Sequence, residues 1–130
     1  MKLIKQKNLI DCGIACAATF CQCSYHKALS FDINPNSSKG LSINELKNIV
    51  LKIKLIKLKE YRPTKYLSLS KNKIIFKSPS ILLIRHPKEK YGHWICYNNN
   101  KIYEPDQDIA KIYNIKQYPR KSWLLIRILS

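Results

Sequence analysis

The sequence predicts an α+β domain in which helices come first and an antiparallel sheet follows. The first half carries two helix patterns, an apolar run over residues 14–23 and an amphipathic run that opens at Ser42. The second half carries several strand-length apolar runs that follow one another without intervening helices. Strands grouped in this way pair antiparallel and pack helices on a face of the sheet. A length of 130 residues suits a single domain, residues 1–130.

Two helices are expected in the N-terminal half. Asp11 is placed as the N-cap of the first, because a short polar side chain there can accept from the first free N–H groups. Ser42 and Glu45 have the spacing of a capping box, and the helix that follows places Leu46, Ile49 and Val50 on one face. Between the helices, residues 32–40 predict a loop, and residues 52–59 are either a strand or a helix end that runs into one.

The strand signals begin after residue 73. Strands are expected over residues 74–76, 79–84, 93–97, 101–104 and 123–129. The run to Ile84 is continuously apolar, as in a strand buried on both faces. Residues 93–104 predict a hairpin with a tip of three asparagines, which tolerate left-handed backbone conformations. Pro105 is expected to end its second arm.

The charge balance is strongly basic, with 24 Lys and Arg against 8 Asp and Glu, a net +16. Such a charge attracts nucleic acid, an anionic membrane or acidic partners. However, 20 of the 24 are lysines, and a nucleic-acid reader more often enriches arginine, whose planar fork binds phosphate and guanine at two points. The lysines therefore also fit a genome rich in A and T codons. A nucleic-acid-binding domain stays an alternative that is not favoured.

The sequence also bears on the cellular compartment. Its longest apolar runs have strand length, well short of the roughly 20 residues of a membrane-spanning helix. No apolar region with a cleavage site follows the first eight residues, so no signal peptide is expected. Five cysteines, an odd number, fit a reducing cytoplasm better than a disulfide framework. A cytoplasmic location is therefore expected.

Cys12 is the sharpest candidate for chemistry. It lies at the first turn of the predicted helix, where the positive end of the helix dipole favours thiolate over thiol. Backbone N–H groups of that turn can also bind an oxyanion. Gln6 lies six residues upstream and can supply a second donor if the chain folds back past Cys12. The competing interpretation of Cys12 is a small buried hydrophobic residue.

Thiol catalysis also needs an imidazole to move protons. Of the three histidines, His26 follows the first helix and His86 lies in a loop, whereas His93 begins an ordered strand that can hold its ring. An acidic side chain on the next strand would fix its tautomer. A hairpin tip at residues 98–99 sets His93 opposite Glu104, and a tip at residues 99–100 sets it opposite Asp106. Both choices stay open.

Two other kinds of site are weighed and set aside. Cys12, Cys16, Cys21 and Cys23 suggest zinc, but the spacing lacks the paired CxxC of common structural sites, and Cys21 would lie off the shared helix face. No glycine-rich phosphate loop occurs in a chain with three glycines. Tyr61, Tyr66 and Phe76 alternate with lysines as in single-strand nucleic-acid platforms, yet aromatic residues in short strands more often belong to the core. No metal or other cofactor is expected.

The combination of Gln6, Asp11-Cys12-Gly13-Ile-Ala-Cys16 and the His93 strand resembles the bacteriocin-processing peptidases, papain-like enzymes that remove double-glycine leader peptides. The segments 40–46 and 79–82 also resemble theirs, and Glu104-Pro105 stands where they usually have Asp-Pro. The resemblance implies a papain-like fold with Cys12 as nucleophile, His93 as general base, Glu104 as orienting acid and Gln6 as oxyanion donor.

What the resemblance implies about activity is a cysteine peptidase that cleaves a peptide or isopeptide bond, with a peptide or protein as substrate. No transporter follows in this sequence, so a role coupled to an exporter is not implied. The use of Glu in place of Asp leaves Asp106 as the second choice for the third residue of the triad. A catalytically inactive papain-like module that only binds peptides is the other alternative, and acidic partners fit the charge.

Overall fold

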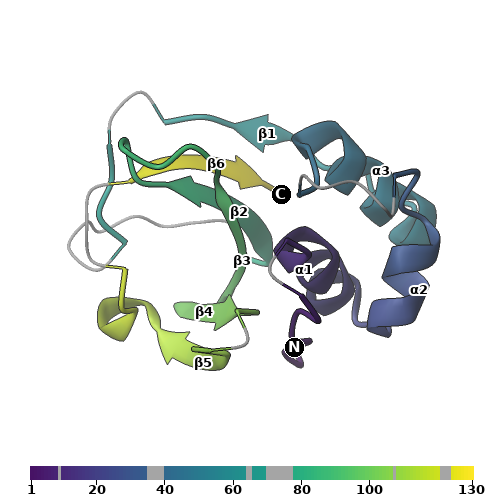
Figure 1. The fold of residues 1–130 in the computed structure, drawn as a ribbon, viewed down its shortest axis with the longest axis horizontal. Helices are drawn as coiled ribbons and strands as arrows, with labels where there is room; N and C mark the ends of the chain where they lie inside the picture. Colours follow the sequence, from purple (N-terminus) through teal and green to yellow (C-terminus); the bar gives the residue numbers. More distant parts are fainter. Residues whose placement is uncertain (9, 35–39, 64–65, 70–77, 107, 121–123) are drawn as a thin grey trace.

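The computed structural model describes residues 1–130 except 9, 35–39, 64–65, 70–77, 107 and 121–123. Three helices lie beside a six-stranded antiparallel sheet whose strand order is β1-β6-β2-β3-β4-β5 (Figure 1). The three helices precede all six strands in the chain, which confirms the predicted α+β class. The helices are α1 (Cys12–Cys21), α2 (Tyr25–Ser30) and α3 (Ile43–Lys54); the strands are β1 (Glu60–Tyr61), β2 (Ser80–Arg85), β3 (His93–Asn98), β4 (Lys101–Glu104), β5 (Lys111–Asn114) and β6 (Leu125–Leu129), with a 3₁₀ turn η1 (Ile115–Gln117) after β5.

Helix α1 is the central helix of the fold. Nine of its ten residues are buried, as the apolar run predicts, and it packs against β3, α2 and α3. Gln22 adopts a left-handed conformation (φ 54°) and ends the helix two residues before the predicted end. Cys23 therefore lies off the helix. Asp11 occupies the N-cap position, but its side chain makes no capping hydrogen bond, so that part of the prediction is wrong.

Helix α3 confirms the capping box. Ser42 Oγ accepts from the Glu45 N–H at 3.1 Å, and the Glu45 carboxylate accepts from the Ser42 N–H at 3.0 Å. The predicted inner face is buried, with Leu46, Ile49 and Val50 at the core. The helix runs to Lys54 and stops at a left-handed Leu55, so residues 52–54 are the end of a helix and the edge strand β1 begins later, at Glu60.

The predicted hairpin is β3 and β4. Its tip consists of Asn99 and Asn100, which both have positive φ (49° and 64°), as a tight two-residue hairpin turn requires. Tyr97 pairs with Ile102 and Cys96 with Tyr103, and β4 ends at Glu104, before Pro105, as expected.

The sheet is buried on both faces over its centre. One buried cluster lies between the sheet and the helices and includes Ile81 and Trp94; the other lies on the opposite face and includes Leu82 and Ile95. Alternate residues of β2 thus enter different clusters, which explains its continuous apolar run. Figure 1 shows α1 beside the middle of this sheet, with α2 and α3 further out.

Some elements were not expected, and some expectations lie outside the described residues. Helix α2 is short and is capped by Ser24, whose Oγ accepts from the Lys27 N–H at 3.1 Å. The strand expected at residues 74–76, part of the loop at 32–40 and the start of the last strand fall on residues that are not described. In the described parts of the chain, no helix combines the length and apolar character needed to cross a membrane.

Candidate active site

Cys12 is the first residue of α1, at the end where backbone N–H groups lack partners within the helix. Its side chain is nearly enclosed, with 9 % of the residue exposed. The next residue, Gly13, lies against Leu41: a Cβ at position 13 would stand 3.0 Å from the Leu41 side chain. A glycine therefore lets the 40–42 segment pack closely on the turn that carries the thiol.

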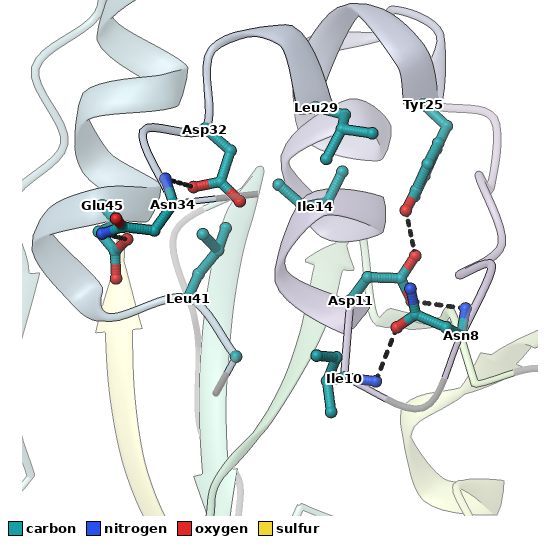
Figure 2. Close-up of a pocket in the computed structure, with 11 residues that line it drawn as sticks. Asn8, Ile10, Asp11, Ile14, Tyr25, Leu29, Asp32, Asn34, Leu41 and Glu45 are labelled. Atoms are coloured by element: carbon teal, nitrogen blue, oxygen red, sulfur yellow. Dashed lines mark hydrogen bonds between the residues drawn. The ribbon is translucent and has the colours of Figure 1, made fainter. Parts of the chain in front are cut away.

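Asp11 holds the chain that leads to Cys12. Its carboxylate accepts from the Lys7 N–H at 2.9 and 3.2 Å and from the Asn8 N–H at 3.0 Å, and it also accepts from the Tyr25 hydroxyl. Figure 2 shows the Tyr25 ring reaching down to Asp11 from α2 at one side of a cavity of about 50 Å³. Asp11 thus fixes the backbone before the helix, although it does not cap the helix itself.

His93 forms a close pair with Glu104. The distance from His93 Nε2 to Glu104 Oε2 is 2.6 Å, and because a carboxylate accepts, Nε2 donates. Glu104 is fully buried. It also accepts from the Tyr118 hydroxyl at 2.6 Å and from the Asp106 N–H at 3.1 Å. Three donors therefore surround this carboxylate, which offsets the cost of burying its charge.

The hairpin register explains why sequence reasoning left two acids open. The hairpin turns at Asn99 and Asn100, which sets position 106 opposite His93, but the pairing between β3 and β4 ends at Tyr103. Glu104, two positions short of the opposite residue, makes the hydrogen bond to the ring. Asp106 supports that carboxylate through its backbone N–H, while its own side chain accepts from the Asp108 N–H at 3.1 Å.

The electrostatics of His93 favour its charged form. Burial alone lowers the pKa of this histidine, but hydrogen bonds to Cys12 and Glu104, together with their negative charges, outweigh burial and raise the pKa to about 9. Since Nε2 is engaged with Glu104, Nδ1 is the ring nitrogen left to bond Cys12. The structure therefore brings together Cys12, His93 and Glu104, three of the four residues expected at the site.

Gln6, the fourth expected residue, is buried and held at two points. Its N–H donates to the Pro105 carbonyl at 2.9 Å, directly after Glu104 in the chain. Its side-chain amide donates to the Asn8 carbonyl at 2.8 Å. Gln6 therefore ties the segment before Cys12 to the end of β4. The chain ahead of α1 does fold back along the site, as an oxyanion donor at this position requires.

The other histidines and cysteines have different surroundings. His26 is exposed and packs edge-on against Tyr25, and the Nδ1 of His86 accepts from the Lys88 N–H at 3.1 Å within a turn. Burial raises the pKa of the Cys16 thiol and raises the pKa of Cys21 to about 12, so both are poor nucleophiles. Across the described residues, no group of three or more His, Cys, Asp or Glu side chains is placed to hold a metal ion.

Two solved structures with a similar fold are peptidase domains. The peptidase domain of Streptococcus ComA, a bi-functional ABC transporter involved in a quorum-sensing pathway, matches 99 % of this chain and 97 % of its own length, with a TM-score of 0.62 and 17 % identity. The chain has the papain-like fold of such domains. The peptidase domain of Streptococcus mutans ComA matches 100 % of this chain and 99 % of its own length, with a TM-score of 0.56 and 17 % identity.

The comparison confirms the predicted papain-like fold, and with it the resemblance to peptidases of the bacteriocin-processing kind. No protein-family model matches the sequence, and no curated protein matches it either. Because the identity to the ComA domains is low, their likeness speaks for the fold, and the chemistry of this chain has to be argued from its own residues.

Sequence reasoning missed two tyrosines that hold the buried acids. Tyr118 follows η1, is fully buried and donates to Glu104; burial and the Glu104 charge raise its pKa, so the hydroxyl stays protonated as a donor. Tyr25 donates to Asp11 from α2. Neither position carries a local motif, because each tyrosine reaches an acid 14 residues away in the chain through tertiary packing alone.

Proposed function

We propose that the protein is a cysteine peptidase in which Cys12 is the nucleophile, His93 the general acid and base, and Glu104 the group that orients His93. The observation that carries this proposal is the hydrogen bond between His93 and Glu104, with His93 interacting with Cys12 at the first turn of a buried helix. The likeness to the ComA peptidase domains supports a substrate of the leader-peptide kind.

In the acylation step, the Cys12 thiolate attacks the carbonyl carbon of the scissile peptide bond. The oxygen of the tetrahedral intermediate accepts hydrogen bonds from the Cys12 backbone N–H and from the Gln6 side-chain amide. His93, which is charged because it holds the thiol proton, donates that proton to the leaving amine as the C–N bond breaks. A thioester between Cys12 and the N-terminal product remains.

In the deacylation step, neutral His93 takes a proton from water, and the hydroxide attacks the thioester carbonyl. The C–S bond breaks, the acid product leaves, and the proton on His93 again pairs with the Cys12 thiolate. Throughout the reaction, Glu104 keeps Nε2–H fixed and stabilises the charged ring. Burial of this pair strengthens its attraction, because little water competes with the hydrogen bond.

The test is labelling with a peptide that ends in an electrophile directed at thiols. We expect a single label on Cys12, complete loss of label in Cys12→Ala, and strong loss in His93→Ala. Cys23→Ala is the matched control, because Cys23 is the partly exposed cysteine outside the site and its removal should leave labelling unchanged. Labelling that persists in Cys12→Ala, or peptide cleavage at the normal rate in His93→Ala, would contradict the proposal.

A further inference from the structure

We propose that a groove lined by Arg62, Arg85 and Arg127 binds an acidic segment of the peptide substrate. This inference rests on the proposed function, because it assigns part of the same substrate to a second region of the molecule. The substrate class that we infer is a peptide with clustered Asp or Glu residues at a distance from the bond that is cut.

The groove lies over β2 and β6 and has a volume of about 460 Å³. Its lining combines three arginines with an apolar floor, and consists of Arg62, Pro63, Leu83, Arg85, Gly92, Leu125, Ile126 and Arg127. A second groove of about 430 Å³ shares Leu83 and Arg127 with the first and continues to Leu41 and the start of α3. Together they form one trough along the helix side of the sheet.

The strand register places Arg85 and Arg127 on one face of the sheet. Leu83 pairs with Arg127, and Arg85 pairs with Leu125, across β2 and β6. Arg85 and Arg127 are therefore diagonal neighbours, with Leu83 and Leu125 between them, since opposite residues share a face and alternate residues of a strand do too. The side chains of Arg62 and Arg127 are 60 % and 40 % exposed, so their guanidinium groups are open to a ligand.

The charges in the groove are not balanced. Glu60 is the acid beside it, at 3.7 Å from Arg62 and 3.8 Å from Arg127. Arg85 donates to the backbone carbonyl of Glu89 at 2.8 Å, a neutral group. Among the described residues that line the two grooves, three arginine side chains are therefore balanced by one carboxylate, that of Glu60. Guanidinium groups bind carboxylates at two points, so an acidic peptide segment complements this groove better than a neutral one.

The groove adjoins both halves of the candidate active site. Gly92 lines it and directly precedes His93; a Cβ at Gly92 would stand 2.7 Å from a methyl carbon of Leu83, so the backbone lies against the groove floor. At the other end of the trough, Leu41 packs on Gly13, the neighbour of Cys12. A peptide bound across Cys12 and His93 can thus continue into the groove.

The use of arginine makes the cluster informative. The chain contains 20 lysines, which its biased composition supplies, and only 4 arginines. Three of those four line this single groove, whereas the fourth, Arg120, does not line it and faces the Glu89 carboxylate at 3.4 Å. A random scatter of basic residues would have placed lysines here. The guanidinium geometry therefore points to recognition of carboxylates at this place.

The test measures binding without cleavage, in the Cys12→Ala chain. The probes are a series of fluorescent 20-residue peptides with blocked ends and a central Gly-Gly. Each peptide carries a block of three consecutive Glu residues, and the block is placed one position further along in each successive peptide. A matched series carries Gln in place of Glu. In fluorescence anisotropy at low salt we expect the best Glu peptide to bind about tenfold tighter than its Gln counterpart, which corresponds to about 1.4 kcal/mol. The preference should shrink as salt screens the charges.

The variant that decides is Arg62→Gln with Arg127→Gln, which changes two exposed side chains and should bring the Glu-to-Gln ratio close to one. Arg120→Gln is the matched control and should keep the ratio. Equal affinities for the two peptide sets, no binding of any Glu peptide, an equal loss in Arg120→Gln, or tighter arginine-dependent binding of a single-stranded DNA probe would each overturn the inference. If the native chain is not labelled at Cys12 but the Cys12→Ala chain still binds the Glu peptides more tightly than the Gln peptides, the result counts against the proposed function alone.

Discussion

Asp11 and Glu104 are the two buried carboxylates among the eight acids of this chain, and the molecule uses them differently. Each accepts from a tyrosine hydroxyl, Asp11 from Tyr25 and Glu104 from Tyr118. The remaining partners of Asp11 are backbone N–H groups before Cys12, whereas Glu104 also binds the ring of His93. One carboxylate fixes a segment of backbone, and the other fixes a group that titrates.

Asp11 therefore acts on the backbone conformation, whereas Glu104 also acts on the charge of a neighbouring side chain. The partners of Asp11 are neutral, so loss of its charge weakens a network of hydrogen bonds and little else. Glu104 faces an imidazole that gains and loses a proton in the proposed reaction, so loss of its charge changes the proton affinity of the catalytic group itself. Variants at these two positions should therefore differ in kind as well as in size.

The largest effect is expected for Glu104→Gln. The amide preserves the shape but removes the charge that stabilises protonated His93, so kcat/KM for a cleaved peptide should fall by about 10² to 10⁴-fold. Steady-state kinetics measure this, with circular dichroism to show that the variant is folded. A fall of less than about threefold would show that Glu104 does not orient the catalytic ring.

The next effect concerns stability and is expected for Asp11→Asn. The amide nitrogen would face the N–H groups of Lys7 and Asn8, so the free energy of unfolding should drop by about 2 kcal/mol in urea titrations. Activity at a temperature where the variant is folded should change far less than in Glu104→Gln. A variant of Asp11 that is fully stable yet inactive would reverse the roles assigned to the two acids.

The pH dependence should distinguish the acids as well. The folded pKa of His93, about 9, is raised above the ordinary 6.5, so its stabilising contribution is complete below pH 6.5 and is lost as the pH rises through about 9. The activity of the native chain should fall over the same range, as His93 loses the proton that it gives to the leaving amine. Glu104→Gln should move this alkaline limb to lower pH. Asp11→Asn should leave it in place, and a shift in both variants would remove the distinction.

The smallest effects are expected for the tyrosines. Tyr25→Phe and Tyr118→Phe each remove one hydrogen bond to a buried carboxylate and should each lower the free energy of unfolding by about 1 to 2 kcal/mol. Because Tyr118 holds the acid that binds His93, only Tyr118→Phe should also lower kcat/KM, by several-fold. Equal kinetic effects in the two variants would mean that both tyrosines act through stability alone.

Local signals made most of the fold predictable. The capping box at Ser42, the apolar helix after Cys12 and the asparagine turn each depend on residues a few positions apart, and each is present. The Asp11 cap failed because other donors, the Tyr25 hydroxyl and the backbone N–H groups of Lys7 and Asn8, bind the same carboxylate. The choice between Glu104 and Asp106 depended on a side chain reaching past its own register position, which sequence periodicity does not report.

In the candidate site too, features that depend on nearby residues were predictable and features that depend on tertiary contacts were not. Cys12 and His93 could be chosen from their places at the starts of a helix and a strand. The role of Gln6 as oxyanion donor came from the family resemblance and stays a prediction. The arginine groove could not be predicted, because Arg62, Arg85 and Arg127 come from three separate segments that only the β2 and β6 pairing and the approach of residues 62–63 bring together. The charge of +16 comes mostly from lysines spread along the sequence, and three of the four arginines line the groove.

The most direct test of the central claim is the rate at which Cys12 reacts with iodoacetamide at pH 6 to 7, followed for each cysteine by mass spectrometry. If Cys12, His93 and Glu104 act together, Cys12 should react at least about tenfold faster than Cys23, and the advantage should disappear in His93→Ala. A Cys12 that reacts no faster than Cys23, or one whose advantage survives His93→Ala, would contradict the assignment of this pair as the catalytic centre.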